Sequence, residues 1–224
     1  METYSDTNNR PDLMKTRRVY RRLLATIMWG AAAMSVMGAF EVKDRDGRIE
    51  ILDEGTVVFG WQHQNLREPK GGEQFMCSAF VHPLATPSGF VLTDVQPGDH
   101  LHHLGVWWPW KMVTVKGQNY VTWEMQKGEG RQVSVSAKIK SQSADKVVLE
   151  AESRHEIKPK DGGYIPVVKE LTTMQFKRIR IDKEPAYQLD ITIAHSPIGD
   201  DPVEITRYRY SGFSWRGTPL WNKD

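Results

Sequence analysis

The sequence predicts an all-β fold, an antiparallel β-sandwich, on the strength of three observations. From residue 40 onward, apolar and polar side chains alternate with a period of two, as they do along half-buried strands. Turn-forming residues separate the alternating stretches at short intervals. After residue 40, no stretch carries an apolar stripe with helical spacing. Strands of this length joined by such turns are typical of a sandwich or a large open β-structure.

Residues 1–39 are predicted to form an N-terminal extension that contains a signal peptide or a membrane anchor. A basic segment, Lys15–Arg22, precedes an uncharged apolar run from Leu23 to Phe40, and this order is typical of an export signal. The run, residues 23–40, is also long enough to span a bilayer, so an uncleaved anchor is the alternative. In both cases we expect the body of the protein to be periplasmic or extracellular, in contact with a membrane only through this leader.

Residues 40–224 are predicted to form the β-sandwich domain. Alternation is clearest in two sets, each with one face on the core: Val133, Val135, Ala137 and Ile139, then Tyr187, Leu189, Ile191 and Ile193. Turns are expected at Asp46-Gly47, Asp53–Gly55, Thr86–Gly89, Lys116–Asn119, Asp161–Gly163 and Gly199–Pro202. Ile205–Trp215 is expected to be a strand with aromatic residues on one face. Because the chain stops soon afterwards at Asp224, we expect a sandwich truncated at its C-terminal end, with a sheet edge uncovered.

Charge and cysteine content exclude two classes of site. The chain has 30 Lys and Arg against 28 Asp and Glu, but six of the basic and three of the acidic residues precede residue 41, which leaves 24 against 25 in the body. A near-neutral body lacks the basic surface that binding to phosphates requires, so no nucleic-acid partner is expected. Cys77 is the single cysteine, which excludes an intramolecular disulfide and a thiolate metal cage and favours a small buried side chain.

The segment Asp99–Trp110, with His82 before it, holds the densest group of chemically active residues. In an extended segment, His100 and His102 share one face while His103 points the other way, and His82 joins the first two if its strand is adjacent. Imidazole titrates near neutrality, so it can exchange protons with a sugar hydroxyl or ring oxygen, and its neutral form binds zinc, copper or iron. The predicted acid–base or ligand cluster is therefore His82, His100, His102 and His103, and a divalent metal at this cluster is the candidate cofactor. Histidines that only satisfy backbone carbonyls are the structural alternative.

Tryptophans follow the histidines directly. Strand alternation would place Trp108 and Trp110 on one face and Trp107 on the other, so that only part of the set can line a cleft. A flat indole beside polar groups suits the apolar face and hydroxylated rim of a carbohydrate ring, although core packing is the alternative. Arg207 and Arg209 would share a strand face and could clamp a carboxylate or a polar sugar. The predicted ligand-binding residues are thus Trp108, Trp110, Arg207 and Arg209.

Other polar residues carry weaker signals. Glu124 and Glu170 could each be a carboxylate base, but a solvated strand face is the expected place for both. His63 and His195 stand alone in the sequence and are expected to be structural. No Gly-rich phosphate loop, Gly-x-Ser-x-Gly elbow or His-Glu-x-x-His helix occurs in the sequence.

Several segments resemble a bacterial family of unknown function that is labelled PmoA-like. They are His82-Pro83-Leu84, Thr86–Gly89, Asp99–Gly105, Trp107, Tyr208–Gly212 and Trp215–Gly217. The label suggests a methane monooxygenase subunit, a multi-span membrane protein, whereas this sequence has no spanning segment after residue 40. The resemblance runs from about residue 41 to the end and implies a galactose-mutarotase-type super-sandwich, a fold common among carbohydrate-active proteins. Members of the family usually continue further, which agrees with the expected truncation.

The sequence therefore predicts an exported carbohydrate-processing protein, an epimerase, a lyase or a glycoside-acting enzyme that uses the histidine cluster. Its partner would be a carbohydrate or another small-molecule ligand. Two alternatives stay open: a carbohydrate-binding module without turnover, and a metal-dependent oxidoreductase as the family label suggests. A carboxylate that converges on histidines would favour an enzyme over a binding module.

Overall fold

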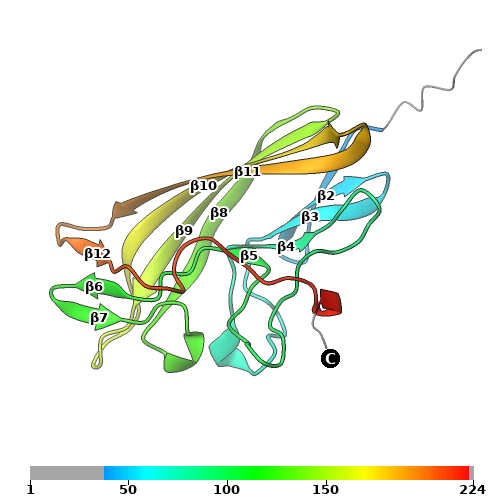
Figure 1. Cartoon of the computed structure of the whole chain (residues 1–224). Helices are drawn as coiled ribbons and strands as arrows, with labels where there is room; N and C mark the ends of the chain where they lie inside the picture. The colour runs from blue at the N-terminus through cyan, green and yellow to red at the C-terminus, as the bar shows by residue number, and fades with distance from the viewer. Residues whose placement is uncertain (1–37, 222–224) are drawn as a thin grey trace, which may run out of the picture. The chain divides into compact units, whose positions relative to one another are not determined.

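The alternating stretches form antiparallel strands in residues 38–221, the part of the chain that the computed structural model describes (Figure 1). The sheets pack against one another as a sandwich, which confirms the predicted all-β fold class. The predicted signal or anchor lies outside these residues apart from its last positions. Within residues 38–221, no helix has the length and apolar character needed to cross a bilayer.

The first sheet contains six strands in the order β1-β2-β3-β4-β5-β13. Their bounds are Glu41–Arg45, Arg48–Asp53, Thr56–Gln62, Phe80–Leu84, Val106–Trp107 and Ser214–Trp215. Every pairing in this sheet is antiparallel. The last strand, β13, comes from near the C-terminus and pairs with β5, so the C-terminal segment is held against the middle of the chain.

The second sheet contains four long strands in the order β11-β10-β9-β8. Their bounds are Glu184–Pro197, Ile165–Ile181, Lys146–Ile157 and Gly130–Gln142. A smaller sheet has the order β12-β6-β7, with bounds Val203–Ile205, Val113–Val115 and Gln118–Tyr120. Three short 3-10 turns complete the described elements: η1 (Glu73–Phe75), η2 (Met125–Lys127) and η3 (Pro219–Trp221).

Two-residue turns with positive φ at both positions connect four pairs of neighbouring strands. This turn geometry matches the right-handed twist of the strands that it joins. The turns are Asp46-Gly47, Glu54-Gly55, Lys116-Gly117 and Asp182-Lys183. The first three confirm predicted turns, whereas the fourth, between β10 and β11, lacks the glycine that marks the others.

The apolar core lies between the first and second sheets. The ring of Phe59 on β3 lies 5.4 Å from that of Phe176 on β10, and Phe40 lies 5.6 Å from Phe176. On the second sheet, every second residue of β9 from Val147 to Ile157 is buried, as the period of a strand with one face on a core requires. A smaller apolar cluster around Val113 joins the third sheet to the ends of β9 and β10.

Strand β8 contains a bulge that the alternation in the sequence did not reveal. Ser134 pairs with Ser153 and Ser136 pairs with Glu152, so Val135 is an extra residue that has no partner on β9. A bulge of this kind shifts the alternation of the strand by one residue.

The bulge overturns the prediction that Val133, Val135, Ala137 and Ile139 share one face. Ala137 and Ile139 pack on the core, whereas Val135 is 44% exposed. Before the bulge it is the even-numbered Gln132 that faces inward, since its side chain reaches residues on the buried face of β9 and β10.

The buried face of the second sheet changes from apolar to polar along the strands. On β9 the buried series passes from Leu149 and Ala151 to Ser153 and His155. On β10 the buried residues Met174 and Thr172 are followed by Glu170, toward the start of the strand. The same sheet face therefore supports the core at one end and presents a buried polar group at the other.

The C-terminal prediction of a strand from Ile205 to Trp215 is wrong. Strand β12 ends at Ile205 and β13 begins at Ser214, and the residues between them form a loop with a turn at Arg209-Tyr210. The loop carries exposed aromatic residues, among them Tyr210 and Phe213.

Candidate functional site

The polar half of the second sheet is organised around the Glu170 carboxylate. Its Oε2 lies 3.0 Å from Nε2 of His155 and 2.8 Å from Nε2 of His195. Its Oε1 accepts hydrogen bonds from Nε2 of Gln132 at 2.9 Å and from Oγ of Ser153 at 3.1 Å. The two carboxylate oxygens thus have different surroundings, one facing two imidazoles and the other held by neutral donors.

Strand register brings these residues together from four strands. Glu170 on β10 is the cross-strand partner of His195 on β11 and of Ser153 on β9. Gln132 on β8 is the partner of His155 on β9. Directly paired residues have neighbouring side chains on one face of a sheet, so the ladder alone places the five side chains next to one another.

Glu170 is an ionised group in a fully buried position. Its exposed fraction is 0%, and that of His155 is 2%. Burial acts to raise the pKa of Glu170. The hydrogen bonds from His155 and His195 and the charges of these two residues outweigh burial and lower the pKa to about 2. A buried charge costs stability unless it is well paired, and perturbed groups of this kind concentrate at functional sites.

The sequence-based expectation of a solvated strand face for Glu170 was wrong, because Glu170 lies in the core. His195, which stands alone in the sequence, contacts Glu170. His155 and Ser153 were not singled out. The available signal was the appearance of polar residues in an otherwise apolar series on β9, at every second position.

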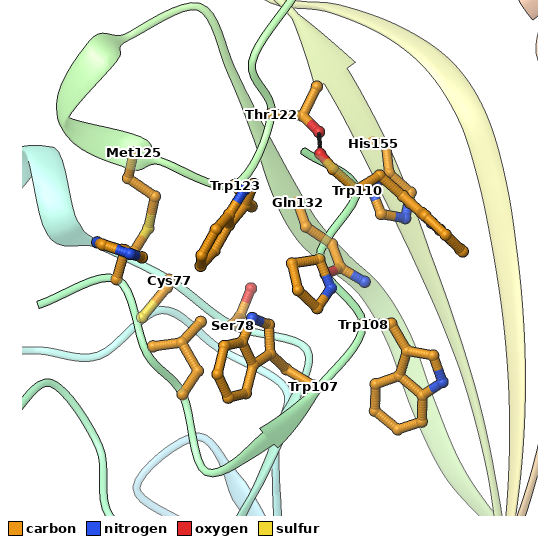
Figure 2. A pocket seen from close by; sticks show the side chains of 13 residues that line it. Cys77, Ser78, Trp107, Trp108, Trp110, Thr122, Trp123, Met125, Gln132 and His155 are labelled. Carbon is orange, nitrogen blue, oxygen red and sulfur yellow. Dashed lines mark hydrogen bonds between the residues drawn. The ribbon is translucent and has the colours of Figure 1, made fainter. Parts of the chain in front are cut away.

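A small cavity adjoins this polar group, with a volume of about 30 Å³ (Figure 2). That is room for one or two water molecules. Its wall includes four tryptophans: Trp107, Trp108, Trp110 and Trp123. Gln132 and His155 of the polar group and His102 also line it. The expectation that only part of the 107–110 tryptophan set could line a cleft is wrong, because the chain leaves the strand conformation after Trp107.

Hydrogen bonds from distant segments hold the Trp110 segment over the polar group. Oγ1 of Thr122 donates to the carbonyl of Trp110 at 2.5 Å, the contact drawn in Figure 2. The Gly212 N–H donates to the carbonyl of Pro109 at 2.8 Å. The Trp110 indole N–H lies 3.2 Å from Nε2 of His195, so the indole covers the partly exposed histidine of the group.

Two indole N–H groups in the cavity wall have no hydrogen-bond partner among the described residues. They belong to Trp107 and Trp123, and both nitrogens are buried. An unsatisfied buried donor costs roughly 1–3 kcal/mol. The cavity wall therefore contains two buried donors that no described residue satisfies.

The histidine turn, residues His100–His103, differs from the extended segment that the sequence predicted. The His103 N–H donates to the His100 carbonyl at 3.0 Å, which closes a turn. The rings of His100 and His103 stack with centroids 4.5 Å apart, and His102 lies 4.8 Å from His103 and 4.6 Å from Trp123. The prediction that His103 points away from the other two is wrong, because a turn brings all three imidazoles together.

The imidazoles of His102 and His103 favour their neutral form. Burial, followed by the neighbouring His102 and His100, lowers the pKa of His103 to about 4. Burial and His100 also lower the pKa of His102. Near neutral pH these two rings can accept hydrogen bonds or bind a ligand through nitrogen lone pairs.

The His82 side chain, on β4, has its hydrogen bond outside the histidine turn. Its Nδ1 is 2.9 Å from Oγ1 of Thr93, and burial and the charge of Arg48 lower its pKa to about 4. The charged groups that act on it besides Arg48 are Asp94 and Lys70. Ring contacts join His100, His102 and His103, and His82 takes part in none of those contacts.

Lowering the pH from 7 to 5 should destabilise the fold by roughly 2 kcal/mol through His82. The pKa of His82 is about 4 in the folded protein against an ordinary 6.5, so between these values the unfolded chain binds a proton that the folded chain does not. The stability contributed by the neutral ring is complete above pH 6.5 and is lost as the pH falls toward 4. Urea unfolding at the two pH values measures the change.

The matched variants for this prediction are His82→Gln and His63→Gln. The pH dependence should shrink in His82→Gln because the titrating ring is gone. His63 contacts the exposed Asp44 at 2.8 Å and serves as the control. An identical pH dependence in wild type and in His82→Gln would contradict the role given to His82.

Potential metal ligands converge away from the predicted cluster. In the described part of the chain, the group of three whose ligand atoms lie within 4.8 Å of one another is His155, Glu170 and His195. The histidine turn, which the sequence made the candidate for a divalent metal, does not bring three ligand atoms together in this way.

The remaining predicted residues lie in varied places. Trp108 is buried, packs against Trp61 at 6.5 Å and still contributes to the cavity wall. Arg207 and Arg209 lie in the exposed loop after β12, where the Arg209 guanidinium lies 4.6 Å from the Tyr210 ring. The shared strand face expected for the two arginines is absent from this loop, and their contact with a ligand stays a prediction.

Two further expectations concern Glu124 and Cys77. Glu124 forms ion pairs with Lys111 and, at 2.6 Å, with Lys127, at the start of a 3-10 turn instead of on a strand. Cys77 is buried, and burial raises the pKa of its thiol to about 12, which confirms the prediction of a small buried side chain.

Residues 48–224 match the model of a family of unknown function, DUF6807. Comparisons with curated proteins and with solved structures give no match.

Proposed function

Since the chain belongs to the DUF6807 family of unknown function, we propose from its site that it is an exported, carbohydrate-processing enzyme that works by acid–base chemistry. The basic segment and apolar run of residues 15–40 support export. The observation that carries the enzymatic proposal is the buried Glu170 carboxylate between His155 and His195, beneath the Trp110 indole.

A convergent carboxylate and imidazole pair favours an enzyme over a binding module. A binding surface needs aromatic faces and hydrogen-bonding groups, but it gains nothing from a charge that is completely buried. In acid–base catalysis, by contrast, a fixed carboxylate orients an imidazole and stabilises its charged form. His195, whose side chain is 22% exposed, is the member of the group that a substrate can reach.

The surroundings of His195 suit a small hydroxylated molecule. The Trp110 ring lies 5.2 Å from the His195 ring and is set edge to face against it. An indole face packs against the C–H face of a sugar while the hydroxyl rim meets polar side chains. The cavity of about 30 Å³ is too small for a sugar ring, so the substrate would bind at the exposed side of His195 and Trp110.

Epimerases and lyases are the reaction classes that fit this group best, because both remove a proton from carbon and need an acid–base residue beside a stabilising charge. The resemblance to PmoA-like proteins and to the galactose-mutarotase-type super-sandwich points to the same class of substrate. Both of these finer assignments belong to the proposal.

The test is carbon-bound hydrogen exchange by the full-length protein in D₂O with a panel of sugars and sugar acids, followed by NMR. Glu170→Gln preserves the size of the side chain and removes its charge, so we expect exchange to fall by roughly 10²–10⁴-fold. Glu152→Gln is the matched control, because Glu152 sits on the opposite face of the neighbouring strand and pairs with Lys169 at 3.1 Å. Equal exchange rates in Glu170→Gln and wild type would refute the role of Glu170, and binding without exchange in all three proteins would favour a binding module.

A further inference from the structure

We infer that His155, Glu170 and His195 form a binding site for one divalent first-row transition metal ion. The inference deepens the proposed function and changes one part of it: Nε2 of His195 would bind the ion instead of exchanging a proton, and the ion would polarise a substrate oxygen. Two imidazole nitrogens and one carboxylate oxygen are a donor set that such metals bind in proteins.

The separations of the ligand atoms fit the spacing around a metal. Bonds of about 2.1 Å place ligand atoms at right angles about 3.0 Å apart, and in a tetrahedron about 3.4 Å apart. The separations from Oε2 of Glu170 to the two Nε2 atoms are 3.0 Å and 2.8 Å. Both separations are close to the octahedral edge, and all three ligand atoms lie within 4.8 Å of one another, so one ion can reach the three residues after a small adjustment of their side chains.

The hydrogen bonds around His195 leave one group unsatisfied when no ion is considered. Nε2 of His195 lies 2.8 Å from the Glu170 carboxylate, which can only accept, and 3.2 Å from the Trp110 indole nitrogen, which can only donate. A single ring nitrogen cannot donate to one and accept from the other. With a cation at the centre, the lone pairs of His195 and Glu170 both face the ion, and Trp110 can donate to a ligand bound there.

The second oxygen of the Glu170 carboxylate, Oε1, is fixed by hydrogen bonds, as is usual for a carboxylate that binds a metal through one oxygen. Oε1 of Glu170 accepts from Gln132 and Ser153 and lies 3.3 Å from Oγ1 of Thr172. These contacts fix the orientation of the carboxylate and leave Oε2 toward the imidazoles. Outer contacts of this kind orient metal ligands in known sites. Since His195 is 22% exposed, an ion can enter from its side.

The experiment is titration of the full-length, metal-stripped protein with Co²⁺, followed by visible absorption and by the melting temperature. We expect one equivalent per chain in wild type and a rise in melting temperature on binding. Affinity should fall by at least about 100-fold in His195→Ala and in Glu170→Gln. His195→Ala removes a partly exposed ligand and keeps the buried pair, so it serves if a substitution at Glu170 prevents folding. His63→Ala is the control and should bind as wild type does.

Each outcome decides the inference. Less than a tenth of an equivalent of Co²⁺ in folded wild type would overturn it, as would wild-type affinity in folded His195→Ala. Loss of binding in His100→Ala but not in His195→Ala would place the ion at the histidine turn and also overturn it. Hydrogen exchange on sugars without metal binding would refute the metal site and leave the proposed function standing, whereas metal binding without exchange on any sugar would do the reverse.

Discussion

Arg178→Ala should lower the free energy of unfolding by about 3–5 kcal/mol. The Arg178 guanidinium donates through Nε to Oδ2 of Asp53 at 2.9 Å, and the Tyr187 hydroxyl donates to the same oxygen at 2.6 Å. Asp53 is only 8% exposed, and the Arg178 hydrogen bond is the main cause that lowers its pKa. Without the guanidinium the carboxylate would be a buried charge with one neutral donor. Urea unfolding at pH 7 measures the loss.

The ion pair also joins the two sheets, because Asp53 ends β2 whereas Arg178 and Tyr187 lie on β10 and β11. Arg180→Ala is the control, since Arg180 is exposed and donates only to the Lys183 carbonyl, at 2.8 Å. Its expected effect is within about 0.5 kcal/mol. Similar losses in the two variants would show that the pair does not hold the sheets together.

Phe176→Ala should cost about 3–5 kcal/mol, the usual loss for a large aromatic residue removed from a core. The Phe176 ring lies between rings from both sheets, 5.4 Å from Phe59 and 4.9 Å from Tyr187, and is 1% exposed. Its removal leaves a cavity that neighbouring strands cannot fill without breaking their ladder. The shift of the urea midpoint, with the slope unchanged, is the measurement.

Phe213→Ala makes the same chemical change at a residue that is 68% exposed, so its unfolding free energy should stay within about 0.5 kcal/mol of wild type. Phe176→Leu should recover most of the loss because it refills most of the volume. A Phe176→Ala protein as stable as Phe213→Ala would contradict the packing of the two sheets described above.

The fold class could be predicted from the sequence because its causes are local. Alternation along β9 and β11 and glycine in the turns at Asp46-Gly47 and Lys116-Gly117 each depend on a few adjacent residues. The turn at Asp182-Lys183 escaped prediction because it uses positive φ without glycine. The bulge at Val135 escaped because it depends on the partner strand and leaves no mark in the composition.

The site was harder to predict because it depends on register. Glu170 is 15 residues from His155 and 25 from His195, and only the pairing of β9, β10 and β11 brings the three together. The residue pattern predicted the site at the histidine turn because the histidines there are adjacent in the sequence. Adjacent residues in the sequence were enough to predict a functional role for His102, which lines the cavity. The role of the buried Glu170 carboxylate could be recognised only from the pairing of strands across the sheet.

The bulge in β8 means that the number of residues in this strand determines which of its side chains face inward. Deleting the extra residue between Ser134 and Ser136 would remove this bulge and keep Ile139 on the core, while the second register shift against β9, between Ile139 and Ser141, would stay. It would also turn every side chain before the deletion to the opposite face, carrying Gln132 away from Glu170. Because of the bulge, odd-numbered residues such as Ile139 face the apolar core after it, whereas the even-numbered Gln132 faces the polar group before it. One continuous strand therefore contributes to both.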